Sequence, residues 1–213
     1  MKPVTVVIDY GASNLRSVVK ALEHVAAGKH KIIVGDTPET IRQADRIVFP
    51  GQGAIRQCMD ALKEKNLTQV LTESIRDKPF LGLCLGLQSL MDYSEEDTGT
   101  PGLGVIPGRV VKFPVGATDD TGNHFKIPHM GWNNVEYLQP HPLWKGIASG
   151  ERFYFVHSYY VKPGLDHDCA GTTGYIVDFT SAIARDNLFA VQFHPEKSQR
   201  AGLQLLSNFL AWE

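Results

Sequence analysis

The residue best placed to do chemistry in this sequence is Cys84, one of three cysteines. It lies in the segment PFLGLCLGLQ at 79–88, where an apolar run leads into Gly-Leu-Cys-Leu-Gly and then into a helical pattern. This arrangement predicts a sharp strand-to-helix turn, on which Gly82 and Gly86 allow close backbone approach. A cysteine on such a turn lies at a helix N-terminus, where unpaired N–H groups and the helix dipole favour the thiolate. The sequence therefore predicts a nucleophile at position 84.

The other two cysteines, Cys58 and Cys169, have no such surroundings. Free cysteine is among the most buried residue types, so both are predicted to be ordinary structural residues. None of the three belongs to a CxxC pair or to a Cys/His set with metal-ligand spacing. We therefore expect no disulfide, no metal site and no cofactor, in a reduced, cytoplasmic protein.

A cysteine nucleophile needs a proton acceptor, and the segment FAVQFHPEK at 189–197 offers one. There an apolar, strand-like run ends in His194-Pro195-Glu196. Pro195 restricts the chain locally, so that Glu196 can orient the imidazole and stabilise its cationic form. Cys84, His194 and Glu196 are therefore predicted to form a catalytic triad for acyl transfer.

Acyl transfer also needs hydrogen-bond donors for the negative oxygen of its intermediate. One is expected from the backbone N–H of Leu85, the residue after the nucleophile. The second is assigned to the loop Gly51-Gln52-Gly53, which lies between a strand-like run and a helical pattern. Taken alone the loop would equally well be a plain glycine turn. Its place before the Cys84 segment favours the oxyanion hole.

The elements that must position these residues are of two kinds. In the first half of the chain, short β-branched runs alternate with helical patterns, which predicts βαβ units around a largely parallel sheet. From about 98 to 193 the runs are strand-like and punctuated by Gly and Pro, which predicts mostly antiparallel strands. The expected strands are 4–8, 31–34, 46–49, 79–83, 108–113, 133–138, 153–161 and 171–179. The expected helices are 14–25, 54–65, 85–91 and 199–210, with another beginning after Thr37 as its cap and Leu203, Leu206 and Leu210 facing inward in the last.

The composition narrows the class of protein. With 213 residues, 43% hydrophobic and 21% charged, the chain has the make-up of an ordinary globular protein, and we expect one domain over 1–213. The formal net charge of −2 and the dispersed Lys and Arg argue against nucleic-acid and membrane partners.

The three chemical segments together carry a family resemblance. PGQG at 50–53, GLCLG at 82–86 and HPE at 194–196, in that order, resemble the signatures of class I glutamine amidotransferases. DYGASNLRSV at 9–18, PHMGWN at 128–133 and FHPEKS at 193–198 resemble one subfamily, the glutaminase subunits of imidazole glycerol phosphate synthases. The resemblance implies an α/β fold with a flavodoxin-like, mostly parallel sheet flanked by helices and an antiparallel β extension.

The resemblance also implies an activity. Glutamine would be hydrolysed to glutamate and ammonia, and the ammonia channelled within a heterodimer to a (β/α)₈-barrel cyclase subunit, which forms imidazole glycerol phosphate and AICAR in histidine biosynthesis. Matched position by position, the substrate-binding residues would be Gln88, Glu96, Ser158 and Tyr159. The partner-facing residues would be His129, Met130, Trp132, Asn133, Tyr154 and Lys197. The chain departs from the subfamily pattern at Ala12, Ser13 and Gln52.

Three rival functions share part of this pattern. A glutaminase of the pyridoxal phosphate synthase or anthranilate synthase type would have the same triad, but the PHMGWN segment argues against it. A subunit that only gates its partner would not need an intact triad. A cysteine peptidase would not need a glutamine-binding residue at Gln88, one helical turn beyond Cys84.

Overall fold

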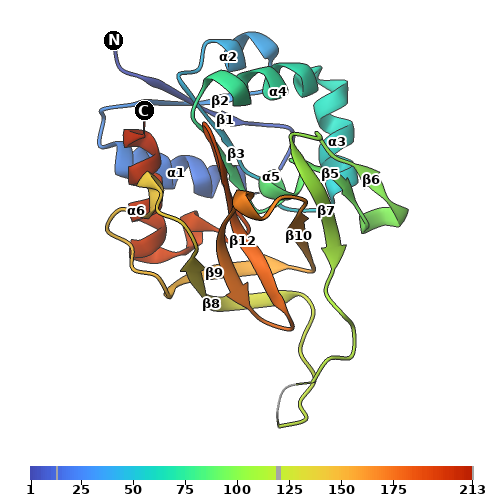
Figure 1. Cartoon of the computed structure of the whole chain (residues 1–213). Coiled ribbons are helices and arrows are strands. Elements are labelled where there is room, and N and C mark those ends of the chain that lie inside the picture. The colour runs from blue at the N-terminus through green and yellow to red at the C-terminus, as the bar shows by residue number, and fades with distance from the viewer. Residues whose placement is uncertain (13, 119–120, 213) are drawn as a thin grey trace.

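The β-branched runs of the first half form the parallel centre of a sheet (Figure 1). The computed structural model describes residues 1–12, 14–118 and 121–212, so Ser13 of the opening motif lies outside the described residues. The parallel strands lie in the order β2 (Lys31–Gly35), β1 (Val4–Ile8), β3 (Arg46–Phe49), β4 (Phe80–Leu83) and β13 (Leu188–Val191).

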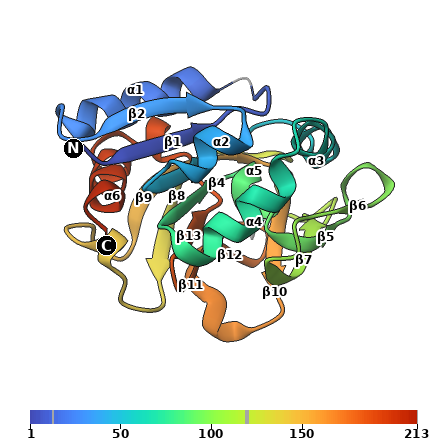
Figure 2. The same cartoon turned by 90° about the horizontal axis from the view of Figure 1, so that it is seen from above.

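Helices cover both faces of this sheet because alternate strand residues point to opposite sides. Val6 and Ile8 of β1 pack into one core with α2 (Pro38–Arg42), α3 (Ile55–Glu64) and α4 (Leu67–Asp77). Val7, between them, packs into the other core with α1 (Leu15–Ala26) and α6 (Gln199–Ala211). Figure 1 shows α1 and α6 side by side next to the strands, and Figure 2 shows α3 at the opposite end of the molecule from α6. The predicted cap at Thr37 is confirmed, since its side chain accepts a hydrogen bond from the Thr40 N–H.

The second half extends the sheet with mostly antiparallel pairs, as predicted. Beyond β13 the order continues with β12 (Asp178–Arg185), β10 (Tyr159–Pro163), β7 (Ile106–Lys112), β5 (Met91–Ser94) and β6 (Thr100–Pro101). A branch of β11 (Cys169–Gly174), β8 (His129–Tyr137) and β9 (Glu151–His157) leaves from β12. Short 3₁₀ turns occupy Glu96–Thr98, Pro142–Trp144, Asp166–Asp168 and Pro195–Lys197. The α/β fold with an antiparallel extension is thereby confirmed.

The helix predicted over 85–91 is shorter than expected. It is α5 (Leu85–Gln88), and Met91 already begins β5. The Leu90 carbonyl accepts hydrogen bonds from the backbone N–H groups of Val105 and Ile106. Pairing with a distant segment therefore replaces the next helical turn.

Two predicted strands are each divided in two. The run 153–161 breaks at Ser158, because β9 pairs with β8 whereas β10 pairs with β7 and β12. The run 171–179 is β11, a turn and the start of β12. Helix α4 was not predicted, and the inward face of α6 includes Leu205 and Phe209, whereas Leu203 is only half-buried.

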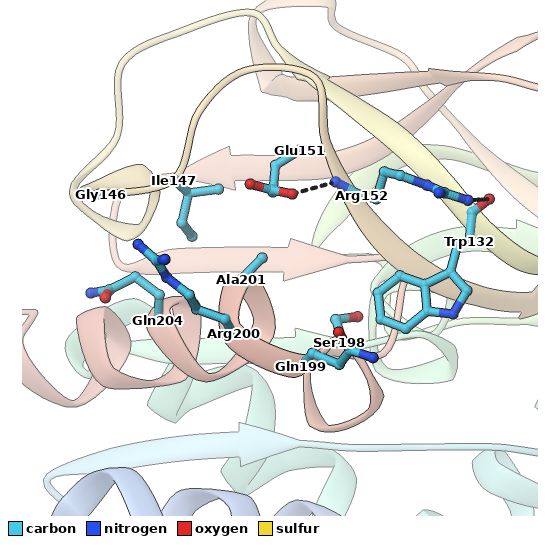
Figure 3. Close-up of a pocket in the computed structure, with 10 residues that line it drawn as sticks. All are labelled: Trp132, Gly146, Ile147, Glu151, Arg152, Ser198, Gln199, Arg200, Ala201 and Gln204. Carbon is cyan, nitrogen blue, oxygen red and sulfur yellow. Dashed lines mark hydrogen bonds between the residues drawn. The ribbon is translucent and has the colours of Figure 1, made fainter.

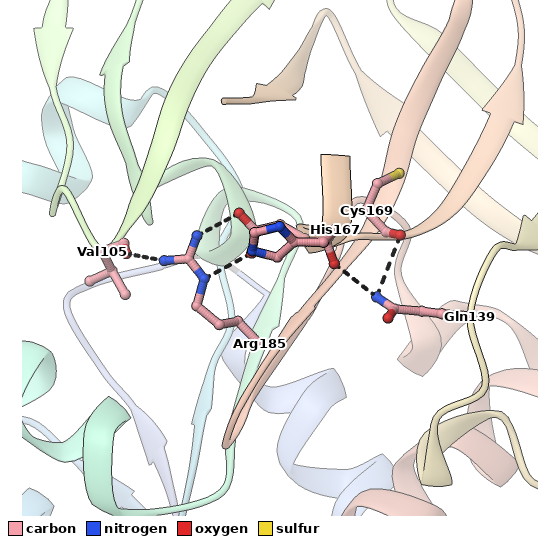
Figure 4. Close-up of polar contacts among 6 residues, drawn as sticks. Val105, Gln139, His167, Cys169 and Arg185 are labelled. Atoms are coloured by element: carbon pink, nitrogen blue, oxygen red, sulfur yellow. Dashed lines mark hydrogen bonds and ion pairs between the residues drawn. The ribbon is translucent and has the colours of Figure 1, made fainter. Parts of the chain in front are cut away.

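A half-buried ion pair fixes the turn between β10 and β11. The Asp168 side chain is fully buried, and the Arg185 Nε donates to its Oδ1 at 2.8 Å. Arg185 also donates to the Val105 carbonyl, and Gln139 donates to the carbonyls of His167 and Cys169 (Figure 4). This network lies apart from the predicted triad and has a structural role.

Within the described ranges, no helix combines the length and apolar character needed to cross a membrane. The expectation of one domain over 1–213 stays a prediction.

Candidate active site

Cys84 lies between the end of β4 and the start of α5 in a conformation that L-residues rarely adopt, with φ 52° and ψ −102°. Its N–H donates to the Val191 carbonyl at 2.7 Å, which ties the turn to the neighbouring strand β13. A Cβ at Gly86 would collide with the Phe49 carbonyl, and one at Gly82 would lie 3.1 Å from the backbone of Gly86. Gly86 is therefore required by close backbone approach, and Gly82 lies in tight backbone contact, as the sequence predicted.

The predicted base and its acid are in contact beside this turn. The His194 Nδ1 lies 2.9 Å from the Glu196 Oε1, and both side chains are almost completely buried. The other ring nitrogen, Nε2, is buried without a hydrogen-bond partner in the part of the chain that is described. His194 therefore has one nitrogen oriented by a carboxylate and one available for a proton.

The electrostatics favour a charged imidazole. Burial opposes the charge on His194, but its interactions with Cys84 and Glu196 are stronger, and they raise the pKa of His194 to about 10. A cysteine thiolate and an imidazolium stabilise each other in this way when they ionise as a pair.

Asn14 supports the carboxylate from a distant part of the sequence. Its Nδ2 donates to the Glu196 Oε1 at 2.6 Å, and although Asn14 occupies the N-cap of α1, its side chain makes no capping hydrogen bond. The side chain that normally caps a helix is used here to hold Glu196.

Asn14→Ala is expected to lower kcat of the predicted amide hydrolysis about tenfold, because the Glu196 carboxylate loses a hydrogen bond that orients it. The matched control is Thr37→Ala, which removes a true cap of α2. That control should lower the free energy of unfolding by about 1 kcal/mol and leave kcat unchanged. Steady-state kinetics and urea unfolding of both variants measure the two effects. An Asn14→Ala enzyme with full kcat would contradict the assignment.

The predicted oxyanion donors are not both free in this conformation. The Leu85 N–H donates to the Gly51 carbonyl, with an N···O distance of 3.4 Å. A Cβ at Gly51 would lie 2.8 Å from the Leu85 Cβ and collide with the Tyr10 hydroxyl. The loop therefore packs directly on the strand-to-helix turn that carries Cys84, called here the elbow. In this conformation the Gly51 carbonyl therefore occupies the Leu85 N–H, one of the two donors of the predicted oxyanion hole.

A pocket of about 520 Å³ opens beside Cys84. It brings together all four residues that the family resemblance assigned to substrate and several from the Gly51–Gly53 loop and the predicted partner face. Its lining comprises Gln52, Gly53, Cys84, Leu85, Gln88, Glu96, Pro128, Tyr154, Val156, His157, Ser158, Tyr159 and Lys197.

Two buried glutamines connect the pocket wall to the nucleophile. The Gln88 Nε2 donates to the Tyr159 carbonyl at 3.0 Å and to the Gln192 Oε1 at 3.1 Å. The Gln192 Nε2 in turn lies 3.5 Å from the Cys84 sulfur. Sequence reasoning missed Gln192, although a lone amide in the apolar run FAVQF is the signal that would have found it.

Glu96 reaches the same pocket from the turn after β5. Its Oε2 accepts the N–H of Ile55, at the start of α3, at 2.9 Å. Burial and the nearby Asp97 raise the pKa of Glu96, and the hydrogen bond from Ile55 opposes them. One carboxylate oxygen is thus bound to the helix terminus at the rim of the pocket.

The residues predicted to face a partner differ in exposure, and Asn133 among them is half-buried. Met130 and Trp132 on β8 are 66% and 37% exposed. Trp132 pairs across the strands with Tyr154, and the Lys197 Nζ lies 5.8 Å above the Tyr154 ring. The structure does not support a partner-facing role for His129. Its side chain is only 3% exposed and is stacked on Phe155 and Tyr175 in the core.

The sequence matches one family model and is similar to subunits of a known enzyme. A family model described as Glutamine amidotransferase class-I matches residues 6–212. The chain is 54% identical over 207 residues to the imidazole glycerol phosphate synthase subunit HisH of Thiobacillus denitrificans, covering 97% of this chain and 90% of that protein. It is 56% identical over 206 residues to the same subunit of Nitrosococcus oceani, covering 97% and 96%.

Solved structures agree in fold. A glutamine amidotransferase crystal structure superposes with a TM-score of 0.71 at 15% identity, covering 97% of this chain and 99% of that one. A glutamine amidotransferase from Thermotoga maritima gives 0.62 at 15% identity, covering 94% and 79%.

Proposed function

Because the chain belongs to the class I glutamine amidotransferases and groups with HisH subunits of imidazole glycerol phosphate synthase, we propose that its triad hydrolyses glutamine to glutamate and ammonia. The observation that carries the proposal is the arrangement around Cys84. The nucleophile stands on the elbow, His194 is held by Glu196, and a pocket large enough for an amino acid opens beside the sulfur.

The reaction follows from this arrangement. The Cys84 sulfur attacks the side-chain amide carbon of glutamine, and a carbon–sulfur bond forms as the carbonyl oxygen becomes negative. His194 then gives its proton to the amide nitrogen, the carbon–nitrogen bond breaks, and ammonia leaves. Water, deprotonated by His194, hydrolyses the thioester to glutamate and restores the thiol.

Glutamine would be held by groups that already line the pocket. Glu96 offers a carboxylate to the substrate ammonium group, the Ser158–Tyr159 segment offers backbone groups, and Gln88 is fixed by two hydrogen bonds near the sulfur. We propose that binding uses these groups as they stand, with little rearrangement.

The ammonia is proposed to pass to a (β/α)₈-barrel cyclase subunit in a heterodimer, where imidazole glycerol phosphate and AICAR are formed in histidine biosynthesis. The relatives named HisH support a two-subunit enzyme, since each is described as a subunit. We propose the cytoplasm as the compartment, which suits an enzyme whose catalytic thiol must stay reduced.

We place the partner on the face formed by Met130, Trp132, Tyr154 and Lys197, called here the β8 face. The backbone N–H of His194 donates to the backbone carbonyl of Tyr154 at 2.9 Å, so this face is bonded directly to the segment that carries His194 and Glu196. Beside Trp132 lies a polar cavity of about 520 Å³ with Arg152 and Arg200 among its lining residues (Figure 3). In Figure 3 the Arg152 side chain reaches back toward the Trp132 carbonyl, which it contacts at 3.5 Å.

Trp132→Ala and Lys197→Ala are each expected to reduce activation by the cyclase about tenfold or more, because large side chains at the centre of an interface carry much of its free energy. For Trp132→Ala, which lies outside the pocket lining beside Cys84, alkylation of Cys84 and the basal rate should stay nearly intact. The matched control is Leu138→Ala, which truncates a 60% exposed side chain just beyond the other end of β8. Titration of glutaminase activity with the cyclase measures the effect. Equal activation of all three variants would exclude this face.

The direct test of the proposed function is glutamate formation from glutamine, measured with and without the cyclase subunit and its ligand. Glutamate formation that depends on this cyclase supports the proposal. Activation instead by a pyridoxal phosphate synthase or anthranilate synthase partner would favour those rivals. Peptide hydrolysis without glutaminase activity would favour the peptidase.

A further inference from the structure

Two buried histidines outside the proposed triad are in direct contact. The His129 Nδ1 lies 3.0 Å from the His157 Nε2, and the residues are 3% and 6% exposed. They are cross-strand partners in β8 and β9, and His129 is stacked on the rings of Phe155 and Tyr175. His157 also lines the pocket beside Cys84.

Burial favours the neutral form of both imidazole rings. Burial lowers the pKa of His129 to about 4. Burial also lowers the pKa of His157 to about 3, and the proximity of His129 and His194 acts in the same direction. A neutral imidazole has one N–H and one lone pair, so each ring donates through one nitrogen and accepts through the other.

The direction of donation is fixed at the pocket end. The His157 Nδ1 lies 2.7 Å from the Tyr159 carbonyl, which can only accept, so Nδ1 carries the proton. The His157 Nε2 must then accept, and the His129 Nδ1 must donate to it. The lone pair of His129 is thereby placed on Nε2.

The contacts of Asn133, at the other end of this chain of hydrogen bonds, independently indicate the same direction of donation. The Asn133 amide is oriented by two backbone contacts, because its Nδ2 donates to the Gly174 carbonyl at 2.8 Å and its Oδ1 accepts the Asn134 N–H at 2.8 Å. The Asn133 Nδ2 also lies 3.2 Å from the His129 Nε2. An amide donor therefore faces the lone pair that the other end requires.

The chain of hydrogen bonds continues to the nucleophile. The Tyr159 carbonyl that accepts from His157 also accepts from Gln88, which donates in addition to Gln192, and Gln192 contacts the Cys84 sulfur. At its other end, Asn133 adjoins the exposed Trp132 on β8. Hydrogen bonds through side chains and the Tyr159 carbonyl thus connect Asn133, the chain neighbour of Trp132, with Cys84.

We propose that His129 and His157 are positioning residues, whose fixed pair of Nδ1–H tautomers holds the Tyr159 carbonyl and, through Gln88 and Gln192, aligns the glutamine pocket with Cys84. The role in substrate binding rests on the proposed glutaminase function. The tautomers themselves do not, because they follow from the contacts of Asn133 and Tyr159 alone.

The first test is ¹⁵N NMR of the full chain with labelled histidine and asparagine at neutral pH. We expect two histidines with a protonated Nδ1 and a bare Nε2, joined by a scalar coupling between imidazole nitrogens across their hydrogen bond. His141 is the internal control, because its Nδ1 accepts the Leu143 N–H and so its proton must lie on Nε2. A protonated Nε2 or a cationic ring at position 129 or 157 would overturn the proposal.

The second test compares His157→Phe with His157→Asn. Phenylalanine keeps an aromatic ring but cannot donate to the Tyr159 carbonyl, so KM for glutamine should rise about tenfold with a smaller change in kcat. The asparagine Nδ2 can take the place of the imidazole Nδ1 and should restore most of the loss. His141→Phe, a matched histidine outside the pocket, should leave KM unchanged.

The results of these tests distinguish a failure of the proposed glutaminase function from a failure of the positioning role of His129 and His157. If the unaltered chain forms no glutamate with or without the cyclase, the proposed function fails, while the tautomers remain measurable in the folded protein. If it forms glutamate and the two His157 variants have equal KM values, the positioning role fails and the glutaminase stands. The NMR measurement needs no variant, so a poorly folding substitution does not remove the test.

Discussion

Cys84→Ala is expected to abolish glutamine-dependent synthesis by the two-subunit enzyme, while ammonium salts at alkaline pH still support it. The substitution removes the only cysteine that stands on an elbow and lines the pocket among the described residues, and loss of a catalytic nucleophile lowers kcat on the order of 10⁶-fold. Ammonia use should survive because it takes place on the other chain. Product formation with each nitrogen source measures both halves.

The matched control for this variant is Cys169→Ala, since the Cys169 sulfur donates to the Gly171 carbonyl and lies 3.4 Å from the Thr180 hydroxyl. It should retain both activities. Retained glutamine-dependent turnover in Cys84→Ala would contradict the assignment of the nucleophile.

The cyclase subunit with its ligand is expected to raise kcat for glutamine about 10² to 10³-fold and to change KM less. In the chain alone the Leu85 N–H is bonded to the Gly51 carbonyl, so the oxyanion lacks a donor that the transition state needs. Reorientation of the Gly51–Gln52 peptide would release Leu85 and present the Gln52 N–H. Glycine on both sides of Gln52 permits such a change at small steric cost, and Gly53 already has φ +110°.

Steady-state glutaminase kinetics with and without the cyclase and its ligand check this expectation. Hydrolysis by the isolated chain should be slow, which avoids releasing ammonia to solvent. A fully active isolated chain would contradict the gating and leave the triad untouched.

The nucleophile could be predicted from the sequence because its signals are local. Gly82, Cys84 and Gly86 lie within one turn of chain, and each glycine answers a specific backbone contact of the folded elbow. The parallel strands were also predictable, since the short apolar runs of β1, β3, β4 and β13 are almost entirely buried, although the edge strand β2 leaves Val34 exposed. The part of the fold that carries Cys84 could therefore be predicted from residues close together in the sequence.

The remaining features depend on pairing between distant segments. The helix after Cys84 stops because Leu90 is bonded to residues more than a dozen positions later, and the strand break at Ser158 reflects a change of partner strand. Contact between His129 and His157 exists only in the register of β8 with β9. Family resemblance assigned His129 to the partner face, but burial by Phe155 and Tyr175 moves it into the core.

The central claim is that Cys84 is the glutaminase nucleophile, and covalent labelling tests it most directly. A glutamine analogue with an electrophilic diazoketone should enter the pocket and alkylate Cys84 alone. Cys58 is 1% exposed and burial raises its pKa to about 12, and the Cys169 sulfur is bonded to the Gly171 carbonyl and the Thr180 hydroxyl. Mass spectrometry of the digested adduct should find the label on Cys84, whereas equal labelling of all three cysteines, or an unlabelled Cys84, would contradict the account.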